Sequence, residues 1–540
     1  MTGSDRDGTL RLLLEPPGPR RVAARYLPVA ALVIAFAAIV ATMPSKISSS
    51  QGNVPTGQWS APPAAKGVTV AGVKCKPGVR QLPFSHYGPM CTPAWQGNNG
   101  GATAPGVTAK TITITYRSAI SPSEQELYSL VAPSVVGTNA GTIQAMRAYI
   151  KVFNKYFDLY GRHVVLKPFN GKGDFLNEDE NNGAPQAQAD AATAKSLGAF
   201  ADISLLSSTA LYDKYLADNK IISINPVGLV NNSWFEKYAP YAYSTSADCE
   251  TLAAGGASFL GRAMAGMPAI YAGSATLRSS LRKIAILYPA TPPTYAACVQ
   301  GIASDLENLY HVKPAAIIGY AIDLGTLTQQ AQTTMEHLKA DGVTTILCGC
   351  DPVSPVLMTD AAANIGYYPE WFWFDIGDAF ARLMNQSEWA HALGAGQQDI
   401  PIRQQGGFKV FQMAYPHQLP TPTFGFVYAS MLLFYSALQE AGPDLTPYTF
   451  EQGFFHLPPS APGGEFGYWR FGNDVFAPAS SDQVLWWDPN AISVVDGKKG
   501  AWRVCNGGAQ YAATPGIGPN VQVPPFHKQL QCFSNAPPPG

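Results

Sequence analysis

Charged residues are scarce in this 540-residue chain. They make up 14% of it, the formal net charge is -1, and neither sign forms a long run. Nucleic-acid binding relies on clustered Lys and Arg side chains that neutralise phosphates, so this class of partner has no electrostatic support. We therefore expect no nucleic-acid partner.

Catalytic and metal-binding motifs are also missing. The chain has no G-x-S-x-G, H-E-x-x-H, P-loop or G-x-G-x-x-G pattern. Its eight histidines are scattered, with no pair at metal-ligand spacing. Cys348 and Cys350 lack the spacing and the second half of a zinc site. We therefore expect no enzyme activity, no metal and no cofactor.

A strand-helix unit is repeated between residues 281 and 352. Residues 282–288 form a short apolar run, typical of a strand buried on both faces, and residues 298–309 carry apolar side chains at helical spacing. The same order of elements then follows at 315–320, 327–338 and 344–348. This pattern predicts a parallel, doubly wound sheet. Ligands of such sheets bind beyond the carboxyl ends of the strands, here in loops 289–295 and 349–355.

A second unit of the same type precedes the first in the sequence. Alternating or apolar runs predict strands at 111–116, 163–167, 201–206 and 221–224. Helical spacing predicts helices at 143–157 and 184–197. Later in the chain we predict a strand at 407–415 and a helix at 424–441 that stops at Gly442. The sequence therefore indicates two lobes, each with its own sheet.

The beginning of the chain carries an uncharged apolar run at residues 27–43, preceded by several arginines. We expect a single membrane span there, with residues 1–26 in the cytoplasm and the rest outside the cytoplasm. The alternative is a cleaved signal peptide. In both cases the body of the protein is extracytoplasmic, where disulfides form.

The eight cysteines fall into two groups. Cys75 and Cys91 lie close together in a Pro-, Gly- and Ser-rich stretch at 44–108, which we expect to be a tether. Cys505 and Cys532 lie close together in a Pro-rich tail at 501–540. Closeness in sequence predicts one disulfide in each stretch. The pairing of the remaining four cysteines stays open: Cys249, Cys298, Cys348 and Cys350.

Several short segments, in this order, give the chain a family resemblance over roughly residues 111–500. They are the helix end from Asn154 to Gly161-Arg162, the Ser207-Ser208 loop, Ile222 to Pro226, Arg282 to Pro289, Asp341-Gly342-Val343 and Ala441-Gly442. With them the chain resembles the type I periplasmic binding proteins, and among these the branched-chain amino-acid-binding subgroup of ABC importers. The resemblance implies two lobes, joined by a hinge, that close on a ligand. We assign residues 109–247 and about 376–462 to the first lobe, and residues 248–375 and about 463–500 to the second.

The resemblance also implies ligand contacts in the first lobe. Ser207 and Ser208 fall where the family holds a ligand carboxylate with a hydroxyl and backbone N–H groups, although a serine there could equally cap the helix that follows. Asn225, Val227 and Gly228 match the next loop, whose main chain contacts the ligand in the family. The Leu that follows Gly228 departs from the small residues and Thr that are usual there.

The resemblance also implies ligand contacts in the second lobe. Tyr295 falls near the position of the family's aromatic wall residue, and Asp351 falls at a contact position. Asp375 falls near the position where the family has an acid that binds the ligand's ammonium. The alternatives are a core tyrosine for Tyr295, a turn residue for Asp351 and a helix cap for Asp375. Arg117, at the end of the first strand of the first lobe, could bind an acidic ligand group or pair with an Asp or Glu across the hinge.

These expectations together describe a membrane-anchored, extracytoplasmic binding protein. It would capture a small polar ligand, an amino acid or a related carboxylate or amide, and present it to the permease of an ABC transporter. The alternative function is a ligand-sensing or cell-surface interaction domain with the same two lobes.

Overall fold

The structure, a computed structural model, describes most of the chain after residue 65. The described residues are 66–119, 137–179, 182–225, 229–323, 325–351, 353–374, 377–514, 516–525, 528 and 530–532. The predicted cytoplasmic segment at 1–26 and the predicted membrane span at 27–43 lie outside them. Among the described residues, no helix is both long and apolar enough to cross a membrane.

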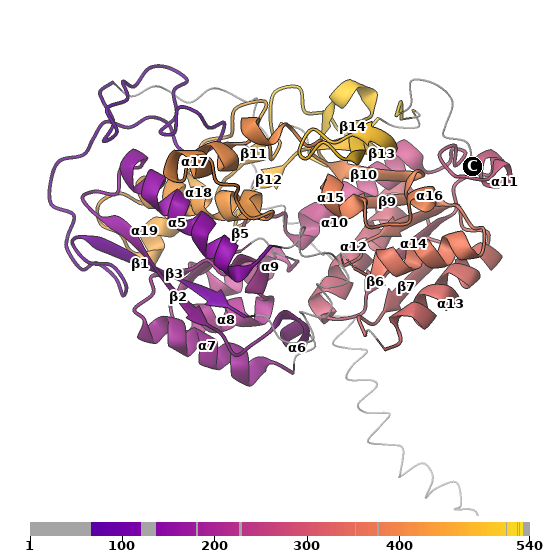
Figure 1. The fold of residues 1–540 in the computed structure, drawn as a ribbon, viewed down its shortest axis with the longest axis horizontal. Coiled ribbons are helices and arrows are strands. Elements are labelled where there is room, and N and C mark those ends of the chain that lie inside the picture. The colour runs from indigo at the N-terminus through magenta and orange to yellow at the C-terminus, as the bar shows by residue number, and fades with distance from the viewer. Residues whose placement is uncertain are drawn as a thin grey trace, which may run out of the picture. The chain divides into compact units, whose positions relative to one another are not determined.

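The first sheet has five parallel strands in the order β2-β1-β3-β4-β5. They are β1 (Thr111–Ser118), β2 (His163–Asn170), β3 (Ala201–Asp202), β4 (Ile222–Asn225) and β5 (Ala242–Ser244). The helices of this lobe are α5 (Asn139–Tyr156), α6 (Phe175–Asp179), α7 (Ala184–Ser196), α8 (Ala210–Asp218), α9 (Asn232–Tyr238), α17 (Gly406–Ala414), α18 (Phe424–Ala441) and α19 (Pro447–Phe455) (Figure 1). Every step from one strand to the next passes through a helical segment, which makes the sheet doubly wound, as predicted.

The second sheet repeats this plan and extends it. Its parallel part has the order β7-β6-β8-β9-β10, and β13 and β14 continue the sheet in antiparallel pairing. The strands are β6 (Ile284–Pro289), β7 (Ala316–Tyr320), β8 (Thr345–Cys348), β9 (Glu370–Phe374), β10 (Ala392–Gly396), β13 (Asp482–Ile492), β14 (Lys499–Val504) and the short β15 (Gln510–Tyr511). The helices are α10 (Cys249–Ser258), α11 (Ala275–Ser279), α12 (Pro293–Tyr310), α13 (Leu327–Ala340), α14 (Ser354–Asn364), α15 (Asp378–Ala381) and α16 (Gln386–Trp389).

Both faces of the second sheet are buried, which explains its continuous apolar strands. In β6, Ala285 and Leu287 belong to one core cluster, whereas Ile284 and Ile286 belong to a second cluster on the opposite face. Successive side chains of a strand point to opposite faces, so a strand with apolar residues at every position contributes to both clusters. The apolar run at 282–288 therefore has the burial that its composition predicts.

In the first sheet, β1 has one apolar and one polar face. Ile112, Ile114 and Tyr116 lie in the core cluster that also contains residues of α5 and α18. Thr115 and Arg117 point to the other face, toward α7 and α8. The alternation of Thr with apolar residues in β1 is thus explained by a polar layer that is buried, not by a face open to solvent.

Residues 66–108, predicted to belong to a tether, instead pack against the first lobe. Leu82, Tyr87 and Val107 are part of its core cluster, and the Tyr87 hydroxyl donates a hydrogen bond to the carbonyl of Gly467 at 2.9 Å. The segment has little sequence periodicity because it contains no long helix or strand. Side-chain hydrogen bonds and the Cys75–Cys91 disulfide hold it in place.

Parts of the chain after residue 375 lie in the other lobe from the one expected. β10 pairs with β9 and β13 in the second sheet, although residues 376–462 are assigned to the first lobe by sequence. Trp469 and Phe471 lie in the core of the first lobe, although residues 463–500 are assigned to the second. The expected tail at 501–540 supplies the end of β14 and all of β15 to the second sheet. Pairings between distant strands leave no periodic signal in the sequence.

The prediction of a strand at 407–415 is wrong, because this stretch forms helix α17. Phe408, Val410, Phe411 and Ala414 are its buried side chains. Phe408, Val410 and Ala414 also fit strand alternation, but the burial of Phe411, three residues after Phe408, fits only a helix. The predicted strand at 201–206 is shorter than expected, because the chain turns into a single 3-10 turn at Leu205–Ser207.

All eight cysteines are paired. The two disulfides predicted from closeness in sequence, Cys75–Cys91 and Cys505–Cys532, are confirmed. The remaining four cysteines form Cys249–Cys298, which joins α10 to α12, and Cys348–Cys350 at the end of β8.

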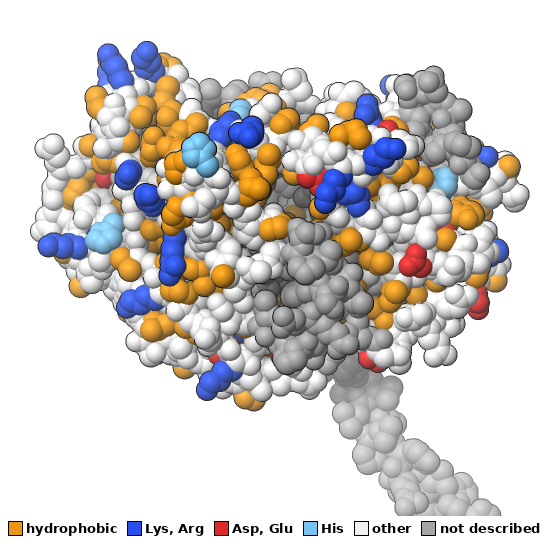
Figure 2. Space-filling model, in the orientation of Figure 1, with side chains coloured by type: hydrophobic (Ala, Val, Ile, Leu, Met, Phe, Trp, Pro, Cys, Tyr) orange, Lys and Arg blue, Asp and Glu red, His pale blue; other side chains and the backbone are white. Residues whose placement is uncertain are grey.

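On the face drawn in Figure 2, Lys and Arg side chains are scattered among hydrophobic and neutral ones, as they are along the sequence.

Candidate ligand-binding site

Five of the predicted site residues lie where the strand order of a sheet reverses. This switch point lies between β1 and β3 in the first sheet and between β6 and β8 in the second. Loops that leave two neighbouring strands in opposite directions open a crevice there, and open α/β sheets bind ligands in it. Arg117, Ser207 and Ser208 belong to the first switch point, whereas Tyr295 and Asp351 follow β6 and β8 at the second.

Arg117 is fully buried and has protein partners. Its guanidinium contacts Glu178 Oε1 at 2.6 Å and Asp190 Oδ2 at 3.4 Å, and it lies 3.7 Å from the ring centre of Tyr212. Burial acts to lower the pKa of Arg117, but the charge and hydrogen bonds of Glu178 outweigh it and raise that pKa. The structure pairs Arg117 with acids of the protein, but both belong to the first lobe and not to the far side of the hinge as expected.

Arg117 also fixes the Ser207 loop. Its guanidinium donates to the carbonyl of Ser207, while the Ser207 hydroxyl donates to the carbonyl of Arg117. Both contacts tie the turn after β3 to the end of β1. The serine loop is therefore held in place by the strand beside it.

Ser208 and Asn225 converge on one carboxylate, that of Asp213 in the first turn of α8. The Ser208 hydroxyl donates to Asp213 Oδ1 at 2.7 Å and the Asn225 amide donates to the same oxygen at 2.6 Å. Asn225 Oδ1 in turn accepts from the amide of Leu205 at 3.2 Å. Burial raises the pKa of Asp213 to about 7, although the hydrogen bond from Ser208 opposes the shift.

A second buried carboxyl group, that of Asp202, lies behind the serine loop. It accepts hydrogen bonds from the hydroxyls of Thr115 at 2.6 Å and Tyr212 at 3.2 Å, and also from Ser204. Burial raises the pKa of Asp202 to about 6, with the hydrogen bonds acting in the opposite direction. The edge of the first sheet is thus a connected polar network beneath the surface.

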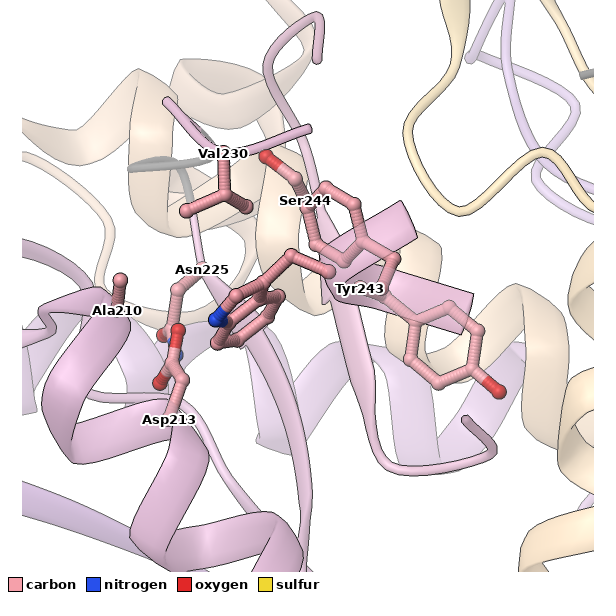
Figure 3. A pocket seen from close by; sticks show the side chains of 8 residues that line it. Ala210, Asp213, Asn225, Val230, Tyr243 and Ser244 are labelled. Carbon is pink, nitrogen blue, oxygen red and sulfur yellow. The ribbon is translucent and has the colours of Figure 1, made fainter. Parts of the chain in front are cut away.

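A small pocket opens beside this network (Figure 3). The carboxylate of Asp213 and the amide of Asn225 lie side by side in it (Figure 3). Apolar side chains complete the wall, among them Val230, Trp234 and Tyr243. The pocket has room for about one water molecule. A ligand of amino-acid size therefore needs this space to widen.

The second switch point is built differently. Asp351 Oδ1 accepts hydrogen bonds from the amides of Val353 at 2.8 Å and Ser354 at 3.0 Å, where α14 begins. Asp351 Oδ2 accepts from the hydroxyl of Tyr320 at 2.8 Å. Tyr295 is half-buried in the first turn of α12, and its hydroxyl donates to the carbonyl of Cys350 at 3.3 Å. Asp351 thus has the contacts of a turn residue at the start of a helix.

Three predicted residues, Val227, Gly228 and Asp375, lie outside the described part of the chain. No group of three or more His, Cys, Asp or Glu side chains within the described part could hold a metal ion.

Four buried carboxyl groups of the first lobe were not predicted from the sequence. Asp202 ends a strand, so the rule that sites gather at strand ends could have indicated it, whereas Asp213 lies in α8 and the rule does not reach it. Glu178 and Asp190 offer no such signal, because they are 61 and 73 residues from Arg117 and only the fold brings them to it.

No protein-family model matches the sequence, and no curated protein matches it either. Several solved structures do resemble the structure of this chain. The fatty acid ABC transporter substrate-binding protein from Thermomonospora curvata has a TM-score of 0.53 and 14% identity, over 80% of this chain and 99% of that chain. The leucine-, isoleucine-, valine-, threonine- and alanine-binding protein from Brucella ovis has a TM-score of 0.53 and 11% identity, over 78% and 99%.

A periplasmic binding protein type 1 from Bordetella pertussis is similar to the same degree, with a TM-score of 0.51 and 12% identity over 73% of this chain and 99% of that chain. At these identities the likeness establishes the fold and not the ligand. The described part of the chain has the fold of the type I periplasmic binding proteins, which is a binding-protein fold.

Proposed function

We propose that this chain is an extracytoplasmic solute-binding protein that captures a small polar ligand and presents it to the permease of an ABC importer. The ligand is an amino acid or a related carboxylate or amide. The observation that carries the proposal is that both sheets place polar residues at the same topological switch point, where open α/β sheets bind ligands. The fold shared with substrate-binding proteins of ABC transporters supports it.

The proposed site has one half in each lobe. Ser207, Ser208 and Asn225 belong to the first half, and Tyr295 and Asp351 to the second. Arg117 positions the Ser207 loop through its two contacts with that residue. The contacts predicted for Val227, Gly228 and Asp375 remain predictions from the resemblance.

The proposed location is the outer face of the membrane, with residues 27–43 as the anchor. The four disulfides support it, because all eight cysteines are paired and such pairs persist in oxidising compartments. An anchor of this kind keeps the binding protein close to its permease.

A thermal-shift panel tests the function. A ligand that binds only the folded state raises the melting temperature by mass action, with about 2.7 kcal/mol of stabilisation at a hundredfold excess over Kd. The panel consists of amino acids, small amides, carboxylates and aromatic acids. We expect at least one class to raise the melting temperature. No response to any member would favour the sensing or interaction domain over the transport protein.

A pair of tyrosines on α12 then tests the site. Tyr295 lies in the first turn of this helix, at the carboxyl edge of the sheet, whereas Tyr310 is the last residue at its opposite end. We expect Tyr295→Ala to weaken binding of the hit at least about tenfold, since an aromatic contact is lost. Tyr310→Ala serves as the matched control and should leave the affinity unchanged. Equal effects of the two substitutions would remove Tyr295 from the site.

A further inference from the structure

The donors that a ligand carboxylate would use at Ser207 and Ser208 are already engaged. The Ser207 hydroxyl donates to the carbonyls of Arg117 and Ser204, and the Ser208 hydroxyl donates to Asp213. The backbone amides of the two serines donate to the carbonyls of Ser204 and Leu205 at 2.9 and 3.1 Å. A hydroxyl has one proton to donate. A ligand carboxylate would therefore have to break hydrogen bonds within the protein before Ser207 or Ser208 could bind it.

Asp213 takes the position in which a bound anion would sit at the start of α8. It lies in the first turn of α8, where the positive end of the helix dipole stabilises a negative charge. It also accepts from Ser208 and Asn225, two of the residues expected to contact the ligand. The chain thus supplies its own carboxylate to the donors of this edge.

The charge of the buried groups at this edge also disfavours a ligand carboxylate. Four buried carboxyl groups, those of Glu178, Asp190, Asp202 and Asp213, share a network with one guanidinium, that of Arg117. A further carboxylate would meet acids that are not fully compensated. Like charges at a desolvated site repel, whereas a cation or an N–H donor would be attracted.

One oxygen of this network accepts no hydrogen bond from the described residues. Asp213 is 6% exposed and lines the pocket, and within the described residues both of its hydrogen bonds go to Oδ1. Its Oδ2 has no donor there. Resting on the proposed function, we infer that Asp213 Oδ2 in the first lobe receives an ammonium or amide N–H group of the ligand, and that this lobe does not hold a ligand carboxylate.

Three probes with the same branched apolar body test this inference. They are leucinamide, 3-methylbutylamine and 4-methylpentanoate, which differ only in the polar groups that they carry. The apolar body matches the side chains of Val230, Trp234 and Tyr243 in the wall of the pocket. By calorimetry on the whole protein, we expect the amide and the amine to bind and the carboxylate not to bind.

Asp213→Asn removes the acceptor charge and keeps the shape of the side chain. We expect it to weaken binding of 3-methylbutylamine at least about tenfold, the loss that corresponds to a hydrogen bond to a charged group. The matched control is Asp218→Asn on the same helix, where the carboxylate is half-exposed and pairs with Lys214; it should leave binding unchanged. Circular dichroism shows whether each variant folds, and the ranking of the three probes on the unaltered protein tests the inference without any variant.

Preferred binding of 4-methylpentanoate, or unchanged amine binding by Asp213→Asn, would overturn the inference and leave the proposed function standing. Binding of none of the three also overturns it. The proposed function fails only if the wider thermal-shift panel gives no response, so the two failures are distinguishable.

Discussion

The carboxyl edges of the two sheets share one topology and differ in their chemistry. At the first edge, between β1 and β3, a buried arginine and four buried carboxyl groups form a connected network. At the second, between β6 and β8, the carboxylate of Asp351 binds backbone amides of α14 and the hydroxyl of Tyr320. Strand order therefore determines where a site can form, and the side chains decide separately in each lobe what it can bind.

The second lobe does contain a buried ion pair, but at the opposite edge. Arg282, just before β6, binds both carboxylate oxygens of Glu370, the first residue of β9, at 2.7 and 2.9 Å. Glu370 also accepts from the Thr345 hydroxyl and the Tyr271 amide. This pair lies at the amino ends of the strands, away from the switch point, and it has the simpler role of joining strands and loops of one core.

Replacing the two arginines gives the largest expected effect. Arg117→Met leaves Glu178 and Asp190 buried without a cation, and we expect it to lower the free energy of unfolding by about 3–5 kcal/mol. Arg282→Met leaves only the carboxylate of Glu370 without a cation, and that group keeps two other hydrogen-bond donors. It should therefore lower the free energy of unfolding by less than Arg117→Met does. Chemical denaturation measures both.

Lys214→Ala is the matched control, because the pair of Lys214 with Asp218 is exposed. It should cost at most about 1 kcal/mol. If Arg117→Met cost no more than Lys214→Ala, Arg117 would not be the counter-ion of this network, and a ligand role for it would regain support.

The buried Glu388 of the second lobe gives a second test, because it should make the stability of the protein depend on pH. It is fully buried in the second lobe, where Oε2 accepts from the Trp371 indole at 3.2 Å and Oε1 has no partner in the described structure. Burial raises the pKa of Glu388 from its ordinary 4.5 to about 8. The folded state then holds a proton that the unfolded state has already released, so stability falls as the pH rises from 4.5 to 8.

We expect Glu388→Gln to remove this loss, because the amide stays neutral. The gain in free energy of unfolding over the unaltered protein should be near zero at pH 4.5 and about 3–4 kcal/mol at pH 8, since each pH unit between the two pKa values contributes about 1.4 kcal/mol. Melting curves across this pH range measure it, with the exposed Glu336→Gln as control. A gain that does not change with pH would show that Glu388 is ionised in the folded protein throughout.

Local patterns predicted most of the two sheets. The apolar run that became β6 and the spacing that became α13 each depend on residues close together in sequence, and so does the helix 424–441, which is α18 with the same bounds. Long-range pairing was not predictable in this way. β10 and β13 are 89 residues apart at the pair Ala395–Val484, and the sequence of neither strand indicates that it pairs with the other.

The site was predictable in its position but not in its partners. The loops after β6 and β8, and the serines after β3, follow from the rule that ligands bind beyond strand ends. The same rule does not reveal that Ser208 donates to Asp213, because that contact requires α8 to place its first turn against the end of β4. The hydrogen-bond donors of this edge can be assigned only when the acceptors are known.

The smallest expected effect comes from Tyr320→Phe at the second edge. The substitution removes the hydroxyl that donates to Asp351 Oδ2 and accepts from the Asp351 amide at 3.2 Å, and it should cost about 0.5–1.5 kcal/mol of stability. Asp351 keeps its two bonds to the start of α14, so the fold persists. If Asp351 contacts the ligand, the substitution releases an oxygen of its carboxylate and changes the affinity for any hit of the thermal-shift panel. If Asp351 is only a turn residue, stability falls while the affinity stays the same, and the ligand-binding chemistry then lies with the first edge and with Tyr295.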